Sequence, residues 1–181
     1  LKTIRWRNLR IQTKNIKPIS PTIEAPVINM TDQLSVFEKA QGYKSLIPLT
    51  GFDGWRSVHS SSPPNKRWLH SNGTFKVEKS DGSETGNDIV TQDQYQAFEL
   101  VFDFKLTAGA NSGIKYFVDE HYDSGGKSGI GLEYQLLDDE VHPDAKEGVV
   151  GNRTLASLYD LIPSEKPAPN FRKKIGEWNT G

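Results

Sequence analysis

Cysteine is missing from all 181 positions of the sequence. This absence excludes disulfides, thiolate metal sites and cysteine nucleophiles, so any bound metal must use oxygen or imidazole ligands. Long apolar runs are missing as well, because no stretch approaches the roughly 20 residues that a membrane-spanning helix needs. We therefore expect no transmembrane span.

The N-terminus lacks the features of a secretory signal. The residues from Leu1 to Trp6 do not form the apolar run of a signal peptide, and position 1 is not methionine. We expect the chain to start inside a longer polypeptide, so the missing signal says little about its compartment.

A large net charge is also absent. The 22 basic and 23 acidic residues give a net charge of −1, which offers no reason to expect nucleic acid or an anionic membrane as a partner. The first segment differs, because six basic residues precede the first acidic one, Glu24. A nucleic-acid-binding arm is the alternative interpretation of that segment. Its basic residues are Lys2, Arg5, Arg7, Arg10, Lys14 and Lys17.

Two segments differ from the rest in their patterning. Residues 4–12 alternate apolar and basic side chains with one slip between Trp6 and Leu9, which predicts a strand with a β-bulge. Residues 13–30 have the Pro, Ser and Thr content of an extended linker.

One short amphipathic helix is predicted at residues 31–41. Thr31 is a suitable N-cap, and Leu34, Phe37 and Ala40 recur at helical spacing until Gly42 ends the pattern.

Short strands dominate the rest of the chain, which predicts an all-β sandwich or jelly roll. In the clearest strand, at residues 98–106, the apolar positions from Phe98 to Leu106 face the core. Its polar positions, Asp103 among them, face either solvent or a ligand. The other runs are residues 68–77, 88–91, 114–118 and 132–137.

Acid–base chemistry is concentrated at residues 133–145. Alternation along a strand puts Glu133 and Gln135 on one face and Asp138 on the other, unless a bulge re-aims Asp138 or Asp139. His142 precedes a proline at the exit of this strand. The alternative interpretation is a solvated acidic loop.

Aromatic residues leave a similar choice. Trp55 and Trp68 are either platforms on which a ligand ring stacks or core residues, and the second is more frequent in a sandwich. The same ambiguity holds for Tyr116 and Tyr159.

An ordered set of sequence blocks runs along the chain, at residues 38–43, 51–55, the strand at 98–106, 111–114, 133–145, 151–154, 158–163 and 176–180. In this order and spacing the blocks resemble the 3-keto-disaccharide hydrolase domain family.

This resemblance implies a concanavalin A-like jelly roll related to laminarinase-type glycoside hydrolases. The family has further strands beyond those matched here, so we expect the roll to be incomplete in this chain. Residues 1–12 resemble the family's final strand. They either end a preceding tandem copy or complete the same sheet, and residues 31–181 form the N-terminal part of the roll.

The resemblance also implies the chemistry. Laminarinase-type enzymes carry Glu-x-Asp-x-x-Glu, whereas this chain has Gln135 and Asp138 at the second and third acidic positions. Direct hydrolysis is therefore the less favoured alternative. The family name implies a substrate already oxidised at C3, from which a base removes the C2 proton before the glycosidic bond breaks and water adds.

We expect Glu133 to be the base and His142 the acid or a metal ligand. Lys115 and Arg153 are candidate oxyanion or hydroxyl contacts. The remaining candidate substrate contacts are Gln135, Asp138 and Tyr116. As a structural alternative, Glu133 only pairs with Lys115, and Arg153 only neutralises Asp138 or Asp139.

No cofactor is required by this sequence. A hard cation such as Ca²⁺ could use a set of carboxylates, although their spacing does not match a helix–loop–helix calcium site. The resemblance implies a carbohydrate substrate and a location in the periplasm or at the cell surface. A non-catalytic carbohydrate-binding module is the rival function. The carboxylates in question are Asp138, Asp139, Glu140 and Asp144.

Overall fold

The chain is mostly β in this computed structural model, which describes residues 3–14, 34–79, 88–121, 128–165 and 173–181. The described strands pair in antiparallel fashion. They are β1 (Thr3–Gln12), β2 (Lys44–Ser45), β3 (Trp55–Ser57), β4 (Trp68–Ser71), β5 (Thr74–Glu78), β6 (Ile89–Thr91), β7 (Glu99–Leu106), β8 (Asn111–Asp119), β9 (Ile130–Leu137) and β10 (Asn179–Thr180). The helices are α1 (Val36–Gln41) and the 3₁₀ helix η1 (Pro143–Lys146).

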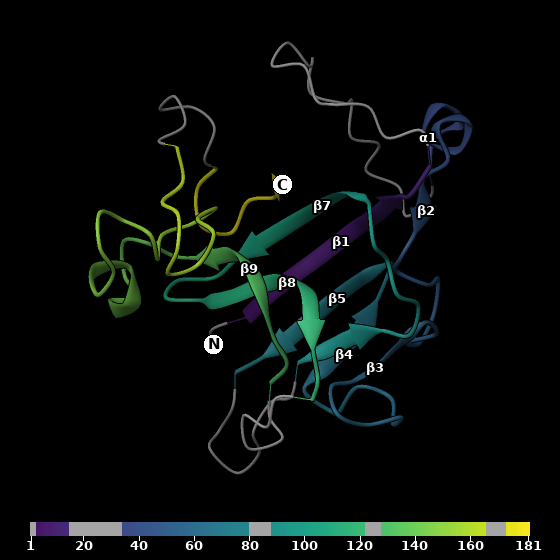
Figure 1. The fold of residues 1–181 in the computed structure, drawn as a ribbon, viewed down its shortest axis with the longest axis horizontal. Coiled ribbons are helices and arrows are strands. Elements are labelled where there is room, and N and C mark those ends of the chain that lie inside the picture. Colours follow the sequence, from purple (N-terminus) through teal and green to yellow (C-terminus); the bar gives the residue numbers. More distant parts are fainter. Residues whose placement is uncertain (1–2, 15–33, 80–87, 122–127, 166–172) are drawn as a thin grey trace.

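The largest sheet has the strand order β10-β7-β1-β5-β4, and β2 pairs with β1. The N-terminal strand therefore lies in the interior of this sheet, between two strands that come much later in the sequence (Figure 1). Most of the predicted linker at 13–30 lies outside the described residues.

The predicted bulge in β1 is confirmed. The register with β7 shifts between Arg7 and Arg10, and Asn8 has a left-handed backbone with φ of 54°. Its side-chain amide donates to Asp103 Oδ2 at 2.8 Å. The extra residue lets apolar side chains face the core on both sides of the slip, since Trp6 and Leu9 are both buried.

The core face of β7 is confirmed in the strand, where Phe102, Phe104 and Leu106 are buried. The expectation of an exposed or ligand-lining polar face is wrong at Asp103, which is only 1% exposed. Thr180 Oγ1 donates to Asp103 Oδ1 at 2.8 Å. Asp103 therefore links β1, β7 and β10.

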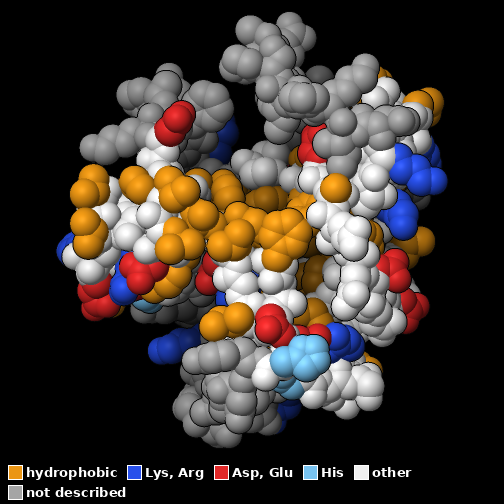
Figure 2. Space-filling model, viewed as in Figure 1, with side chains coloured by type: hydrophobic (Ala, Val, Ile, Leu, Met, Phe, Trp, Pro, Cys, Tyr) orange, Lys and Arg blue, Asp and Glu red, His pale blue; other side chains and the backbone are white. Residues whose placement is uncertain are grey.

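A second layer, the β8–β9 hairpin, lies in front of this sheet (Figure 1). Ile114, Tyr134 and Leu136 pack against the same apolar cluster as Phe102. Figure 2 shows hydrophobic side chains exposed across the middle of the face that carries the hairpin. On the hairpin itself the Phe117 side chain is 62% exposed. The described residues therefore cover this side chain only in part.

Both candidate tryptophan platforms are partly buried and pack against the core. Trp68 stacks on Trp6 with ring centroids 5.4 Å apart. Trp55 packs edge-on against Phe75 and donates its indole N–H to the Leu46 carbonyl at 2.6 Å. The more frequent of the two interpretations is thus confirmed for both.

The helix prediction needs correction. Helix α1 begins at Val36 with Ser35 as N-cap, and Ser35 and Glu38 form a capping box. Thr31 lies outside the described residues. Phe37 is 70% exposed, so the predicted apolar face does not pack on the core. In the described part of the chain, no helix is long and apolar enough to cross a membrane.

The single predicted run at 68–77 is a hairpin of β4 and β5. Asn72 and Gly73 both have positive φ, of 49° and 62°. This Asn-Gly pair is the residue choice that a two-residue hairpin turn requires.

Candidate active site

Three residues from separate segments form a row on the outer face of the hairpin. Lys115 on β8 lies directly opposite Glu133 on β9. On the other side of β9, Tyr159 donates its backbone N–H to the Glu133 carbonyl at 2.9 Å, and Leu158 forms a bridge with Tyr134. Residues directly opposite one another project to the same side of a sheet. The row Lys115–Glu133–Tyr159 therefore faces away from the core.

The Glu133 carboxylate lies over Gly113. A Cβ atom at position 113 would lie only 1.9 Å from Glu133 Oε1 and 2.5 Å from Cγ. The side chain can therefore adopt this position only because residue 113 is glycine. This accounts for the glycine of the Asn-Ser-Gly block as a structural requirement of the site.

Glu133 is half-buried, and burial raises the pKa of its carboxyl group. The Lys115 charge lowers this pKa, whereas Asp88 and Asp144 raise it further. Among the described residues, no hydrogen bond or ion pair engages the Glu133 side chain. A desolvated carboxylate with a raised pKa and free oxygens is suited to act as a general base.

Lys115 is held by Asp88, which precedes β6, and by two residues of the loop that leads into β9. Its Nζ lies 2.8 Å from Asp88 Oδ2, 2.5 Å from Ser128 Oγ and 3.2 Å from the Gly129 carbonyl oxygen. Three acceptors satisfy the three N–H groups of an ammonium. The structural alternative of a simple Glu133–Lys115 ion pair is therefore wrong, since the ion pair of Lys115 is with Asp88.

Arg153 and Tyr159 both bind Asp144. The Tyr159 hydroxyl donates to Asp144 Oδ2 at 3.0 Å, and Arg153 Nη1 donates to Oδ1 at 3.1 Å. Arg153 also holds Asp160 through two hydrogen bonds of 2.8 and 3.0 Å. Burial and the bond to Asp144 raise the pKa of Tyr159. Arg153 thus does not use Asp138 or Asp139, the partners considered from the sequence.

Gln135 and Asp138 are each 1% exposed. The amide of Gln135 lies 3.4 Å from Asn111 Oδ1. Asp138 accepts the backbone N–H of Gly109 at 2.7 Å and that of Glu140 at 3.3 Å. Asp138 therefore holds the loop before β8, and Gln135 contacts the first residue of β8. Neither side chain is open to a substrate in this structure.

His142 and Tyr116 lie away from the row. His142 is the N-cap of η1, and its Nδ1 accepts the Asp144 backbone N–H at 3.3 Å. It lines a separate cavity of about 310 Å³. Tyr116 lies on the inner face, where it contacts Phe98 and Phe117. The other residues of the cavity are Ile4, Arg67, Val77, Glu78, Lys79, Gly109, Ala110 and Asn111.

The carboxylates considered for Ca²⁺ are engaged in different contacts. Asp138 holds Gly109, Asp139 accepts the Leu155 backbone N–H at 2.8 Å, and Asp144 binds Tyr159. Within the described ranges, no group of three or more His, Cys, Asp or Glu side chains could hold a metal ion.

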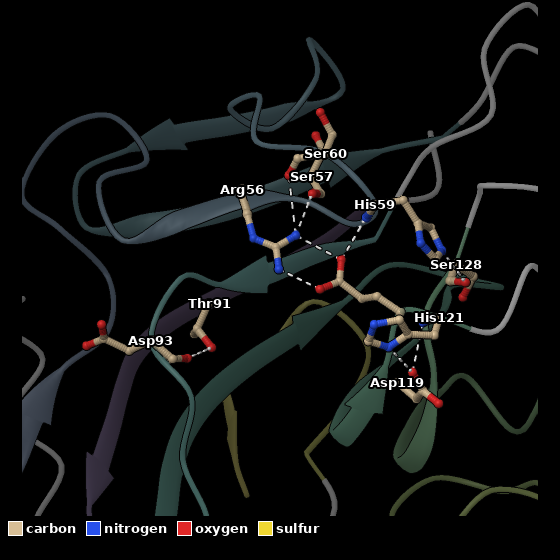
Figure 3. Close-up of polar contacts among 10 residues, drawn as sticks. Arg56, Ser57, His59, Ser60, Thr91, Asp93, Asp119, His121 and Ser128 are labelled. Atoms are coloured by element: carbon tan, nitrogen blue, oxygen red, sulfur yellow. Dashed lines mark hydrogen bonds and ion pairs between the residues drawn. The ribbon is translucent and has the colours of Figure 1, made fainter.

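The far end of β8 is fixed by an ion pair (Figure 3). Arg56 binds both carboxylate oxygens of Glu120, at 2.8 and 2.5 Å, and the backbone N–H of His59 donates to the same group at 2.7 Å. These hydrogen bonds, that of Arg56 first, lower the pKa of Glu120 to about 2. Together with the Lys115–Asp88 pair, this contact holds β8 beside the β3–β6 strands.

Comparison with known proteins identifies the family. The model of the 3-keto-alpha-glucoside-1,2-lyase-like domain matches residues 42–181. The chain belongs to this family. A protein of Bacteroides thetaiotaomicron named 3-keto-disaccharide hydrolase is 37% identical over 161 residues, which cover 82% of the chain and 54% of that protein. The chain therefore spans about half the length of this relative.

Within this lyase-like domain, sequence reasoning missed several residues around Glu133. Asp88 belongs to a segment far from β9, and Ser128 lies in the loop just before it. No local pattern links either residue to Lys115. Asp144 was considered only for Ca²⁺, and Tyr159 only for stacking. The available signal was the pair Tyr159–Asp160 in the 158–163 block.

Proposed function

We propose that this chain carries the catalytic base of an enzyme that cleaves 3-keto glycosides. The observation that carries the proposal is the half-buried Glu133 carboxylate, free of hydrogen bonds from the described residues and flanked by Lys115 and Tyr159. The description of the matched family and the name of the relative give the substrate class.

The proposed reaction begins with proton abstraction. A ketone at C3 acidifies the C2 proton, which Glu133 removes to give an enolate. Lys115 stabilises this enolate through its positive charge rather than through a direct hydrogen bond, because its three N–H groups are already engaged. The C1–O bond then breaks and leaves a 1,2-unsaturated 3-keto sugar, to which water adds.

The departing glycosidic oxygen needs a proton, and Glu133 has just acquired one. The alternative donor in the row is Tyr159, but its hydroxyl proton is directed to Asp144 at 3.0 Å. We therefore assign both proton transfers to Glu133. The alternative expected from the sequence, in which His142 is the acid, is tested by the experiment below.

Two rival functions receive less support. Double displacement needs two carboxylates about 5 to 5.5 Å apart across one sugar, whereas Asp138 is buried in contact with Gly109. A carbohydrate-binding module needs exposed aromatic platforms, whereas Trp55 and Trp68 both pack against the core.

The same proposal includes the wider setting of the site. The two antiparallel layers, with Glu133 on the outer face of the smaller one, support a concanavalin A-like jelly roll. A periplasmic or surface-exposed location is part of the proposal through the family alone. The reaction as drawn uses no cofactor. Treatment with a chelator should leave the rate unchanged.

The test compares a 3-keto disaccharide with its unoxidised counterpart, using the full natural polypeptide and following the release of reducing sugar. We expect cleavage of the oxidised substrate alone. Glu133→Gln should lower the rate by about a thousandfold, and His142→Gln should change it by less than about threefold if Glu133 is both base and acid. Equal cleavage of both substrates, or an active Glu133→Gln variant, would overturn the proposal.

A further inference from the structure

A row of three positive charges crosses the outer face of the largest sheet. Arg5 on β1 lies directly opposite Lys76 on β5 and directly opposite Lys105 on β7. Like charges placed opposite one another destabilise a sheet, and alternating signs are the favourable arrangement. This row therefore carries an electrostatic cost in the free protein.

The neighbouring residues relieve that cost only in part. Lys76 Nζ lies 2.8 Å from Glu78 Oε1. For Arg5 and Lys105, the described part of the chain provides no acidic partner. Burial, and then the charges of Arg5 and Arg7, lower the pKa of Lys105.

An aromatic ring holds the cations in place. Trp178, which directly precedes β10, has the Arg7 guanidinium carbon 3.9 Å and Lys105 Nζ 4.8 Å from its ring centroid. Arg7 itself is neutralised by Asp103 at 3.4 Å. The cation–π contacts limit the freedom of Lys105 but leave its charge and that of Arg5 uncompensated.

This row is separate from the Glu133 site. Ile4 and Trp6, on either side of Arg5, are buried in the core, so Arg5 projects from the opposite face of β1. That face is turned away from β8 and β9 in Figure 1. The hydrophobic core lies between the two surfaces.

We propose that the row Lys76–Arg5–Lys105 is a binding surface for an acidic glycan, which it recognises through carboxylate or sulfate groups. Adjacent strands lie about 4.8 Å apart, which is close to the length of one sugar ring, so successive acidic sugars can lie across successive strands. A net charge of −1 does not favour nucleic acid, and the family match favours a carbohydrate.

The test measures binding of the full natural polypeptide to three glycans by calorimetry at low salt. Polygalacturonate supplies carboxylates, dextran sulfate supplies sulfates, and dextran is the neutral control. We expect one or both acidic glycans to bind, with an affinity that falls as salt is added, and dextran not to bind at this surface. No binding of either acidic glycan, or equal binding of dextran, would overturn the proposal.

Matched variants locate the surface. Arg5→Gln combined with Lys105→Gln should weaken binding by about tenfold, which corresponds to about 1.4 kcal/mol. Lys39→Gln combined with Lys44→Gln removes the same charge from α1 and β2 and should change affinity less than twofold. Equal losses in both double variants, or tighter binding of duplex DNA than of either glycan, would contradict the assignment. Neither measurement depends on catalysis at Glu133.

Discussion

Two rows of side chains have opposite electrostatic designs. One crosses β8, β9 and the segment that bridges to β9 at Leu158, and the other crosses three strands of the largest sheet. In the row Lys115–Glu133–Tyr159 a positive group, a negative group and a neutral hydroxyl alternate. In the row Lys76–Arg5–Lys105 all three groups are positive. In the first row the Glu133 carboxylate has no hydrogen-bond partner among the described residues, whereas Lys115 and Tyr159 both have theirs. The second leaves charge unsatisfied, which points to binding rather than catalysis.

The residues next to each row differ in the same way. Gly113 leaves room for the Glu133 carboxylate, whereas Trp178 covers part of the space beside Lys105. A catalytic group needs an open path to its substrate. A binding surface gains from side chains that are already held in place.

The largest effect is expected from filling the space that Gly113 leaves for the Glu133 side chain. Gly113→Ala introduces a Cβ where the Glu133 side chain now lies. We expect a loss in kcat of about a hundredfold, because misplacement of a catalytic group by about 1 Å has that effect. Steady-state kinetics measures this, and Ser112→Ala on the inner face is the control. Unchanged kcat in Gly113→Ala would show that the position of Glu133 is not catalytic.

How far the sequence predicts these rows depends on the range of the contacts. Alternation along one strand correctly placed Phe102 and Phe104 in the core, and the slip in β1 correctly predicted its bulge. These are local consequences of a two-residue period. Helix α1 failed the same kind of reasoning, since Phe37 is exposed although its spacing is helical.

The candidate site was only partly predictable for a different reason. Glu133 and Lys115 were identified, and the structure places them opposite one another. Asp88, 27 residues before Lys115, has no sequence signal because its contact depends on how β6 packs beside β8. Asp138 was assigned to substrate, although its place on the other face of the alternation was visible.

Releasing Lys115 gives the next largest effect. Asp88→Asn removes the charge that holds Lys115 Nζ and that raises the pKa of Glu133. We expect a loss of about tenfold in kcat/KM. This is less than the roughly hundredfold or more that removal of a direct electrostatic donor costs, because Lys115 keeps its charge. The acidic limb of the pH profile should also move to lower pH. Asp93→Asn, at the exposed position labelled in Figure 3, is the control. If the acidic limb of the pH profile does not move, Asp88 does not influence the pKa of the catalytic Glu133.

Stability should respond to Glu133 in the opposite direction from activity. Its folded-state pKa is raised, so its contribution to stability is complete below the unfolded value of about 4.3 and is lost as pH rises through the folded pKa. Glu133→Gln should therefore melt at a higher temperature than wild type near pH 7. Below about pH 4 the difference should disappear. Thermal melts from pH 3 to 8 measure this, and a constant difference would contradict the assigned burial.

The smallest predicted effect is a change in stability, and it concerns the row Lys76–Arg5–Lys105. Arg5→Gln removes the central charge between two lysines, and relief of two cross-strand repulsions should raise the free energy of unfolding by about 0.5 kcal/mol at low salt. Added salt should reduce that gain, because it screens the repulsion in wild type. Urea denaturation at two salt concentrations measures both quantities. Lys115→Gln is the opposite case, because it breaks the ion pair with Asp88 and should destabilise the protein. If Arg5→Gln were also destabilising, the row would be satisfied by contacts within the protein, and the case for an external anion would be lost.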